Sequence, residues 1–304
     1  MNPRCQTVNG IQLGRSFFEI TSAWLRRFDL ALPAASTYNR AMITDIVRPK
    51  TVTEAVRAKT APGAAYLGGG TWLNSGRAEN VTTLVSLENL GLGSIQTESG
   101  RCIIGASVTF QALVDSPLVP SALREAARLT ASRTLRNMVT VGGEFGLSPD
   151  DSAVIPVLIV LDAEVSVAGR KKLLPIESFL DENRTGLVLG VSVPAQAAAA
   201  VSAVSRTSHS PRSLVAAVSA RAAAPMLDRP RLVLSDCRGR RVRLTAAERK
   251  LDGAPIPSRQ DIEALARAEF TPRPDMHASV AYKRYMAGVM VADLLAALIS
   301  KAAR

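Results

Sequence analysis

The stretch AAYLGGGTWLN, residues Ala64–Asn74, places three consecutive glycines between a short apolar run and a threonine. Glycine admits positive φ and lets backbone N–H groups face outward with no Cβ in the way. A second stretch of this kind, TVGGEFG, spans Thr140–Gly146. Successive N–H groups can form a concave anion site, and a threonine hydroxyl adds a donor. The two stretches indicate either a pair of loops that holds a diphosphate or two tight turns.

Neither stretch has a familiar nucleotide-binding pattern. The sequence contains no G-x-x-x-x-G-K-[ST], which excludes a P-loop. Gly68, Gly69 and Gly70 do not form a G-x-G-x-x-G that opens a helix, which disfavours a Rossmann fold.

Length and composition predict a soluble globular protein. The chain has 304 residues, of which 47% are hydrophobic and 21% charged, enough for two domains and a sizeable core. No apolar run reaches the roughly 18–20 residues that cross a bilayer, and we expect neither a membrane span nor a secretory signal. Cys5, Cys102 and Cys237 lie far apart, which fits a reducing cytoplasm and excludes a self-contained iron–sulfur or zinc site.

The formal net charge of +11 is the unusual total. A basic surface is typical of proteins that meet nucleic acid, an anionic membrane or an acidic partner. Apart from CRGRRVRL at 237–244 the basic residues are scattered, and aromatic residues make up only 4%. Binders of single-stranded nucleic acid interleave basic and aromatic residues, so we expect no nucleic-acid partner. We interpret the arginine cluster as a solvated hairpin.

The chain divides into an extension and two domains. Residues 1–41 show no clear periodicity, and we expect an extension that is disordered or not native. A compact domain is predicted over 42–211, since Thr51 and Glu54 have capping-box spacing. The turn signal HSPRS then predicts a boundary and a smaller domain over 212–304.

Short strands and helices alternate within the first domain. We expect Thr109 to cap a helix over 110–115, Ser121 to cap one over 122–129, and a further helix to begin near Pro156. The stretches TGLVLGVSVP (185–194) and AAVSAVSRT (199–207) are predicted to form an antiparallel pair. The second domain is predicted to contain strands at 214–222, 229–236 and 240–245, and helices at 259–268 and 279–301.

Four stretches besides the first glycine segment support a family resemblance. They are VRPKTVTEAV (47–56), SRTLRNMVTVGGE (132–144), PVLIVLDAEV (156–165) and ASVAYKRYMAGVMVADLL (278–295). Together they resemble the FAD-binding (medium) subunit of molybdenum hydroxylases, the xanthine dehydrogenase and carbon monoxide dehydrogenase medium chains. The resemblance runs from about Met42 to the C-terminus. It implies an α+β fold: a two-lobed PCMH-type FAD-binding domain, then a small C-terminal domain with an antiparallel sheet and helices.

The resemblance also implies FAD as cofactor and names the residues that hold it. The first contact segment is Tyr66, Leu67, Gly68, Gly69, Gly70, Thr71, Trp72 and Leu73, and the second is Thr140, Val141, Gly142, Gly143 and Glu144. Val188 is expected to pack against the flavin and Arg206 to lie near it. Three residues depart from the family pattern: Glu144 stands for a frequent asparagine, Ala153 for an aspartate that bonds the FAD polyol, and Arg206 for a lysine.

The sequence contains no catalytic machinery of its own. His209 and His277 have no neighbouring Asp–Ser or Cys arrangement, so a hydrolytic triad has no support. The resemblance implies partners: an iron–sulfur (2Fe–2S) subunit, a molybdopterin-binding large subunit and, as electron acceptor, NAD+ or another molecule. Two alternatives stay open, a docking subunit that has lost flavin and a free-standing flavin oxidase of the vanillyl-alcohol oxidase type.

Overall fold

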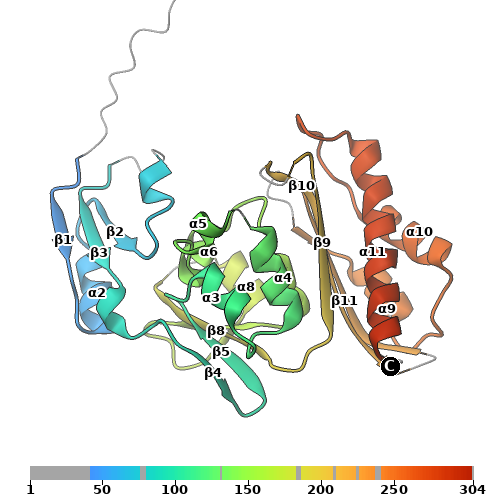
Figure 1. The fold of residues 1–304 in the computed structure, drawn as a ribbon, viewed down its shortest axis with the longest axis horizontal. Coiled ribbons are helices and arrows are strands. Elements are labelled where there is room, and N and C mark those ends of the chain that lie inside the picture. The colour runs from blue at the N-terminus through green and yellow to red at the C-terminus, as the bar shows by residue number, and fades with distance from the viewer. Residues whose placement is uncertain are drawn as a thin grey trace, which may run out of the picture. The chain divides into compact units, whose positions relative to one another are not determined.

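The computed structural model describes residues 42–75, 80–130, 132–182, 186–207, 210–223, 226–236 and 241–302 (Figure 1). The predicted extension, residues 1–41, lies outside them. Residues Ala41–Arg304 form one compact unit. None of the helices in the described residues has the length and apolar character that a membrane span requires.

The first lobe is a small parallel sheet with one helix. Strands β1 (Asp45–Val47), β3 (Thr83–Ser86) and β2 (Ala64–Leu67) lie side by side in that order, and α2 (Val52–Lys59) connects β1 to β2. The Thr51 hydroxyl caps α2 by accepting the Glu54 N–H at 3.2 Å, as the capping-box spacing predicts. Glu54 in turn accepts the N–H of Lys50, one residue before the cap, at 2.8 Å. A separate small core lies here, made of Ala55, Ala64, Val85, Leu87 and Leu187.

The second lobe is an antiparallel sheet of five strands in the order β4-β5-β8-β6-β7. These strands are β4 (Ile95–Glu98), β5 (Arg101–Gly105), β6 (Glu164–Val167), β7 (Leu174–Pro175) and β8 (Val188–Pro194). Six short helices accompany them: α3 (Phe110–Asp115), α4 (Ser121–Leu129), α5 (Arg133–Arg136), α6 (Val141–Leu147), α7 (Val154–Val160) and α8 (Ile176–Asp181). Two 3-10 turns, η1 (Leu73–Ser75) and η2 (Glu88–Leu90), belong to the connections of the first lobe.

The predicted helix starts of this lobe are partly right. Thr109 caps α3 by accepting the Ala112 N–H at 3.2 Å, which confirms that prediction. The prediction that Ser121 caps the next helix is wrong, because α4 includes Ser121. Its N-cap is Pro120, whose side chain can neither donate nor accept a hydrogen bond. Helix α7 contains Pro156 at its third position, where the missing proline N–H removes no intrahelical bond.

The C-terminal part contains a four-stranded antiparallel sheet in the order β12-β11-β10-β9. Its strands are β9 (Ala199–Ser205), β10 (Arg212–Ala223), β11 (Met226–Asp236) and β12 (Arg241–Arg243), with helices α9 (Thr245–Leu251), α10 (Arg259–Glu269) and α11 (Val280–Ala302). Figure 1 shows α11 along the sheet, where it packs mainly against β10 and α10. The α+β class is confirmed, as are the three strands and the two helices predicted after residue 212, but α9 was not predicted.

Both faces of this sheet are buried, which explains the uninterrupted apolar run in β10. Val215 and Ala217 point into the core of the second lobe, where α4 and α7 also pack. Leu214, Ala216 and Val218 point the other way, into the core formed with α9, α10 and α11. Alternate residues of a strand face opposite sides of its sheet, so a strand covered on both sides is apolar throughout.

The predicted pairing of 185–194 with 199–207 is wrong. Strand β8 lies between β5 and β6 in the five-stranded sheet, whereas β9 pairs with β10 in the C-terminal sheet. Sequence alternation reveals a strand but not its partner, and here the four residues between Pro194 and Ala199 carry the chain from one sheet to the other. The domain limit at residue 211 stays a prediction, and the pairing of β9 argues for a limit nearer Ala199.

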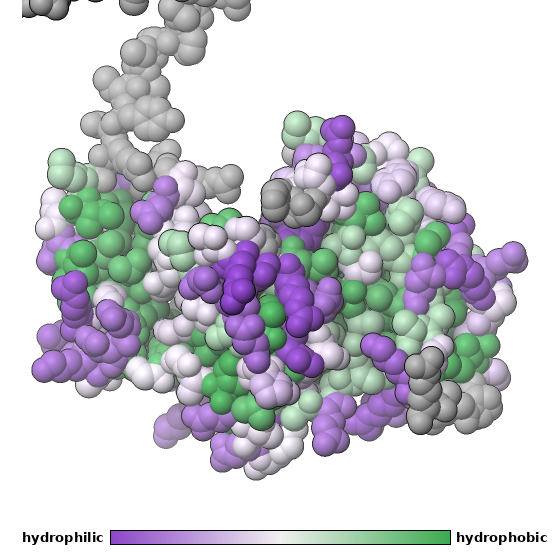
Figure 2. All heavy atoms as spheres, in the orientation of Figure 1, coloured by the Kyte–Doolittle hydropathy of each residue, from purple (hydrophilic) through white to green (hydrophobic). Residues whose placement is uncertain are grey.

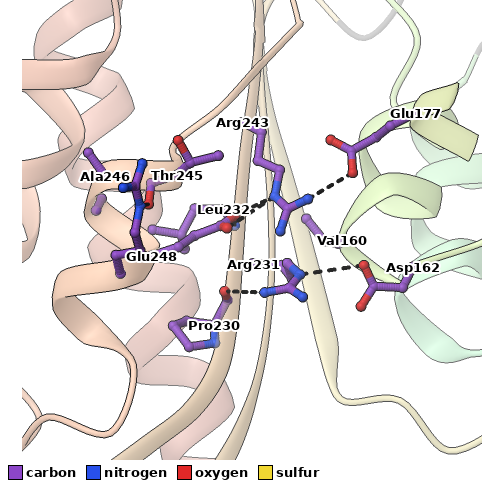
Figure 3. A network of polar contacts seen from close by, with 12 residues as sticks. Val160, Asp162, Glu177, Pro230, Arg231, Leu232, Arg243, Thr245, Ala246 and Glu248 are labelled. Atoms are coloured by element: carbon purple, nitrogen blue, oxygen red, sulfur yellow. Dashed lines mark hydrogen bonds and ion pairs between the residues drawn. The ribbon is translucent and has the colours of Figure 1, made fainter. Parts of the chain in front are cut away.

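A polar network joins the second lobe to the C-terminal sheet (Figure 3). The Arg243 guanidinium on β12 donates to Glu248 of α9 at 3.0 Å and to Glu177 of α8 at 2.8 Å. Below it, Arg231 of β11 lies 3.4 Å from the Asp162 carboxylate in the turn after α7. The Glu248 carboxylate is nearly inaccessible and also accepts the Leu232 N–H at 2.9 Å. The network therefore fixes α8, β12 and α9 to one another.

Candidate functional site

A cavity of about 690 Å3 lies between the two lobes and reaches the start of β10. The first lobe contributes the end of β2 and the triple-glycine segment, and the second lobe contributes α6 and the residues that precede β8. Of the residues expected to hold FAD, those that line it are Tyr66, Gly68, Gly69, Gly70, Thr71, Trp72, Leu73, Thr140, Gly142, Gly143, Glu144 and Val188. Two segments some 70 residues apart in the chain therefore share one concave site. Its volume lies within the range of roughly 300–1,000 Å3 that is typical of small-molecule sites.

The glycines of the first segment allow it to press against the second. A Cβ built on Gly69 would stand 1.4 Å from the Met138 carbonyl oxygen, a position that no side chain can occupy. A Cβ on Gly68 would stand 2.9 Å from the Thr140 hydroxyl. Gly70 has φ +72°, a left-handed conformation that disfavours any residue with a Cβ. The requirement for glycine at Gly69 therefore comes from contact between two backbones.

The first segment also presents unused backbone donors to the cavity. Among the described residues, no acceptor is bonded to the N–H groups of Gly69, Gly70 or Thr71. Gly69, Gly70 and Thr71 are only partly exposed and line the cavity, so their three successive N–H groups are available to a ligand or to water there. Consecutive N–H groups around a residue of positive φ form the concavity in which anions bind.

The second segment is the start of a helix, which corrects its description as a loop. Helix α6 begins at Val141, and the Thr140 hydroxyl caps it by accepting the Gly143 N–H at 3.1 Å. Val141 and Gly142 donate to the carbonyl oxygens of Val108 and Ala106, at 3.0 and 2.7 Å. A short helix forms here despite two glycines because its first N–H groups all have partners. The free donors of the cavity are therefore those of the first segment.

Glu144 lies in the first turn of α6 with its carboxyl buried, and the residue is only 5% exposed. Its side chain accepts a hydrogen bond from the Ser152 hydroxyl. Desolvation raises the pKa of Glu144 from 4.5 to about 7, and the negative charge of Asp151 acts in the same direction. The Ser152 hydrogen bond and the positive charges of Arg241 and Arg212 oppose this pKa shift. Glu144 is therefore partly protonated at neutral pH.

Arg212 closes the cavity from the side of the C-terminal sheet. It is 8% exposed, donates to the Asp151 carbonyl at 2.8 Å and carboxylate at 3.2 Å, and also donates to the Leu129 carbonyl. Arg241 on β12 donates to the carbonyl oxygens of Ser148 and Pro149, at 3.1 and 2.6 Å. Sequence reasoning missed this cluster, because nothing local in RSLVAAV indicates that its arginine is buried beside a loop 60 residues away.

The remaining residues of interest lie elsewhere. Leu67 and Val141 do not line the cavity, and Val141 is buried in the core of the second lobe. Arg206 is exposed at the end of β9 and does not line the cavity, so its role near the flavin stays a prediction. Ala153 is completely buried at the N-cap of α7. His209 and the cluster 237–240 lie outside the described residues.

Among the residues that the structure describes, neither a metal-binding group nor a cysteine lines the cavity. Within the described residues, no group of three or more His, Cys, Asp or Glu side chains is arranged to hold a metal ion. Cys102 is a free thiol in the core of the second lobe, where burial raises its pKa. His277 does not line the cavity but lies in a loop of the C-terminal part. Its backbone N–H donates to the Asp275 carboxylate at 2.7 Å, and Lys283 donates to the same carboxylate.

Comparison with known proteins gives a family match and a curated relative. Residues 40–196 match a family model described as the FAD binding domain in molybdopterin dehydrogenase. Over 263 residues the chain is 34% identical to YgfM of Escherichia coli (strain K12), described as an uncharacterized protein. That alignment covers 84% of this chain and 96% of YgfM.

Solved structures share the fold. A chain of the carbon monoxide dehydrogenase from Hydrogenophaga pseudoflava superposes with a TM-score of 0.77 at 25% identity, covering 85% of this chain and 98% of that one. CO dehydrogenase from Oligotropha carboxidovorans gives 0.76 at 22% identity, covering 86% and 99%. Quinoline 2-oxidoreductase from Pseudomonas putida 86 gives 0.77 at 18% identity, covering 86% and 98%. The described fold is thus shared over nearly the whole length of each neighbour.

Proposed function

Because the chain belongs to the family of FAD-binding domains of molybdopterin dehydrogenases, we propose that it is the FAD-binding electron-transfer subunit of a molybdenum-dependent hydroxylase or dehydrogenase. The membership confirms the family expected from the sequence and its cofactor, FAD. Electrons would leave a substrate at a molybdopterin-binding large subunit, cross 2Fe–2S clusters on a small subunit and reach this chain. NAD+ or another acceptor would then remove them.

The observation that supports this function best is the row of unused N–H groups at the wall of the cavity. Gly69, Gly70 and Thr71 would donate to the oxygens of the FAD diphosphate. Because Gly69 is fixed against Met138, these donors need little reorganisation when the ligand arrives. The fit is chemical as well as geometric, since a dinucleotide flavin carries an anionic centre that such donors bind.

The apolar part of the cavity suits the flavin ring. Phe179, Leu187 and Val188 are buried and line it, and so does Tyr66 of β2, whose pKa is raised by burial. Trp72, at 37% exposure, stands at the cavity and would cover the ligand from the solvent side. When bound, the flavin supplies the redox chemistry, and these side chains hold it and exclude water.

The hydrophilic and basic character of the surface supports the proposal that the chain docks to other subunits. Figure 2 shows hydrophilic side chains gathered over the middle of one face of the described chain, where Figure 1 shows helices of the second lobe. One helix of this lobe, α4, carries Arg124 and Arg128. The chain's excess of positive charge would favour association with an acidic partner. Because the described residues offer no metal-ligating group, the molybdenum and iron–sulfur centres would lie on partners.

Two experiments test the two halves of this proposal. The chain is purified at its natural level from its own host, and the complex is analysed for iron and molybdenum. Both metals in fixed ratio to the chain are expected, whereas a metal-free protein with flavin would favour the free-standing oxidase. The complex is then titrated with NADH without oxygen. Bleaching of the flavin absorbance supports NAD+ as acceptor, and an unchanged spectrum points to a different acceptor.

A further inference from the structure

Glu144 is the one carboxyl of α6, and it shares the cavity with the free N–H groups of the first segment. It follows Thr140 by four residues, which is one helical turn, and Thr140 is the residue against which Gly68 packs. Because Glu144 and Gly69–Thr71 line the same cavity, an ionised Glu144 would repel a phosphate held by this segment. Repulsion between like charges grows as the local dielectric constant falls, and the Glu144 side chain is buried.

The charged groups around Glu144 leave its ionisation poorly compensated. On the loop before α7, Asp151 adds a negative charge, and Ser152 supplies the hydrogen bond to the carboxyl. Arg212 of β10 is bonded to Asp151 and Leu129, and Arg241 of β12 to Ser148 and Pro149, so both act on Glu144 only at a distance.

The strands packed against α6 do not change this balance. They are β5 and β8, and their described residues include one charged side chain, Arg101. Arg101 stands at the end of β5 away from α6 and pairs with Glu164 at 2.8 Å. In addition, the first N–H groups of α6 are already bonded within the chain, so the helix start offers a bound anion no free donor to offset Glu144.

We propose that Glu144 is a proton-controlled gate on the affinity of this cavity: the site holds its diphosphate-bearing ligand when Glu144 is protonated and loosens it when the carboxylate forms. The inference rests on the proposed function, since it takes FAD to be the ligand. Glu144 is a positioning residue here, acting on the phosphates by its charge and touching no reacting atom. Its burial places the change near neutral pH, where partial release would follow a modest rise in pH.

The test is an equilibrium titration of the full chain with FAD, followed by flavin fluorescence between pH 6 and pH 8. If only protonated Glu144 permits tight binding, the dissociation constant rises about tenfold over these two pH units. Glu144→Gln carries no titrating proton and should bind FAD with no such rise. The negative charge of Asp151 raises the pKa of Glu144. Asp151→Asn removes this charge, so the rise in the dissociation constant should move to lower pH.

Riboflavin, which has the ring and the polyol but no phosphate, serves as the uncharged probe. Its affinity should change much less with pH, because the repulsion acts on phosphate. A pH-independent FAD affinity, or the same rise in Glu144→Gln, would overturn the gate and leave the proposed function standing. If neither the natural chain nor Glu144→Gln binds FAD at any pH while both stay folded by circular dichroism, the proposed function itself fails and the gate with it.

Discussion

The Met138 carbonyl oxygen lies so close to the Cα of Gly69 that a Cβ on Gly69 would stand 1.4 Å from it. This contact brings the triple-glycine segment against the residues just before α6, and it places the free N–H groups of Gly69–Thr71 at the cavity. The cavity therefore depends on one backbone-to-backbone approach that only glycine permits.

Gly69→Ala should damage both stability and flavin binding. The added methyl group forces the two segments apart, and overpacking of this kind costs roughly 1–3 kcal/mol in the free energy of unfolding. Urea denaturation and the FAD content of the purified protein measure the two effects. Gly93→Ala is the matched control, because a Cβ there meets no atom within 4 Å and its φ is not positive. Equal behaviour of the two variants would contradict the role of the Gly69–Met138 contact.

Glu144→Gln should stabilise the flavin-free chain at neutral and higher pH. The folded-state pKa of Glu144, about 7, lies above its ordinary value of 4.5, so protonated Glu144 favours the folded state. That stability is complete below about pH 4.5, falls between pH 4.5 and 7, and stays constant above, a loss of up to roughly 3 kcal/mol.

Thermal denaturation across this range measures the effect. The difference in Tm between Glu144→Gln and the natural chain should grow from pH 5 to pH 7 and then level off. A difference that does not vary with pH would show that Glu144 does not titrate in this window.

Arg243 should matter far more than Glu177, although the two form a pair (Figure 3). Arg243→Met leaves the carboxylate of Glu248, with 7% of its side chain exposed, without its cation, and breaking a buried pair in this way costs about 3–5 kcal/mol. Glu177 is 43% exposed, so Glu177→Gln should cost less than about 1 kcal/mol. Urea unfolding of both variants compares them, and a larger loss for Glu177→Gln would contradict this order.

Lys283 and Asp275 form a buried pair whose two halves should not be equivalent. The Lys283 ammonium has no exposed side-chain area and donates to Asp275 and to the Arg273 carbonyl. Asp275 also accepts the backbone N–H groups of His277 and Ala278, at 2.7 and 2.8 Å. Asp275→Ala leaves a buried ammonium with one neutral partner and should cost about 3 kcal/mol or more.

Lys283→Met should cost less than Asp275→Ala, because the Asp275 carboxylate keeps its two backbone donors. Chemical denaturation of both single variants and of the double variant measures the asymmetry. The double variant should recover part of the loss of Asp275→Ala. Without such recovery, the loss belongs to the loop and not to the unpaired charge.

The sequence predicted the elements well where local chemistry decides them. Thr51 and Thr109 cap helices because a threonine before an apolar periodic run satisfies free N–H groups wherever the helix lies. The last helix and the strands after residue 212 follow from their periodicity. Long-range pairing was harder: β8 and β9 look alike in sequence, and only the cores on either side decide which sheet each joins.

For the site, the sequence predicted which segments meet but not what each provides. The two glycine stretches do line one cavity. Only the first stretch offers free N–H groups to the cavity. In the second, Val141 and Gly142 donate to the carbonyl oxygens of Val108 and Ala106, which come from a segment over 30 residues earlier in the chain. From the sequence, Glu144 is notable only because it stands where the family often has asparagine. Its burial and its hydrogen bond to Ser152 depend on tertiary packing, which no local pattern encodes.

The most direct test of the account is the cofactor content of the purified full chain, read from its visible absorption spectrum and from the molecule released on denaturation. The account predicts a flavin spectrum and FAD in equimolar amount to the chain, with loss of FAD in Gly69→Ala and retention in Gly93→Ala. A folded, colourless protein that takes up no added FAD would contradict it, and the chain would then be a docking subunit without flavin.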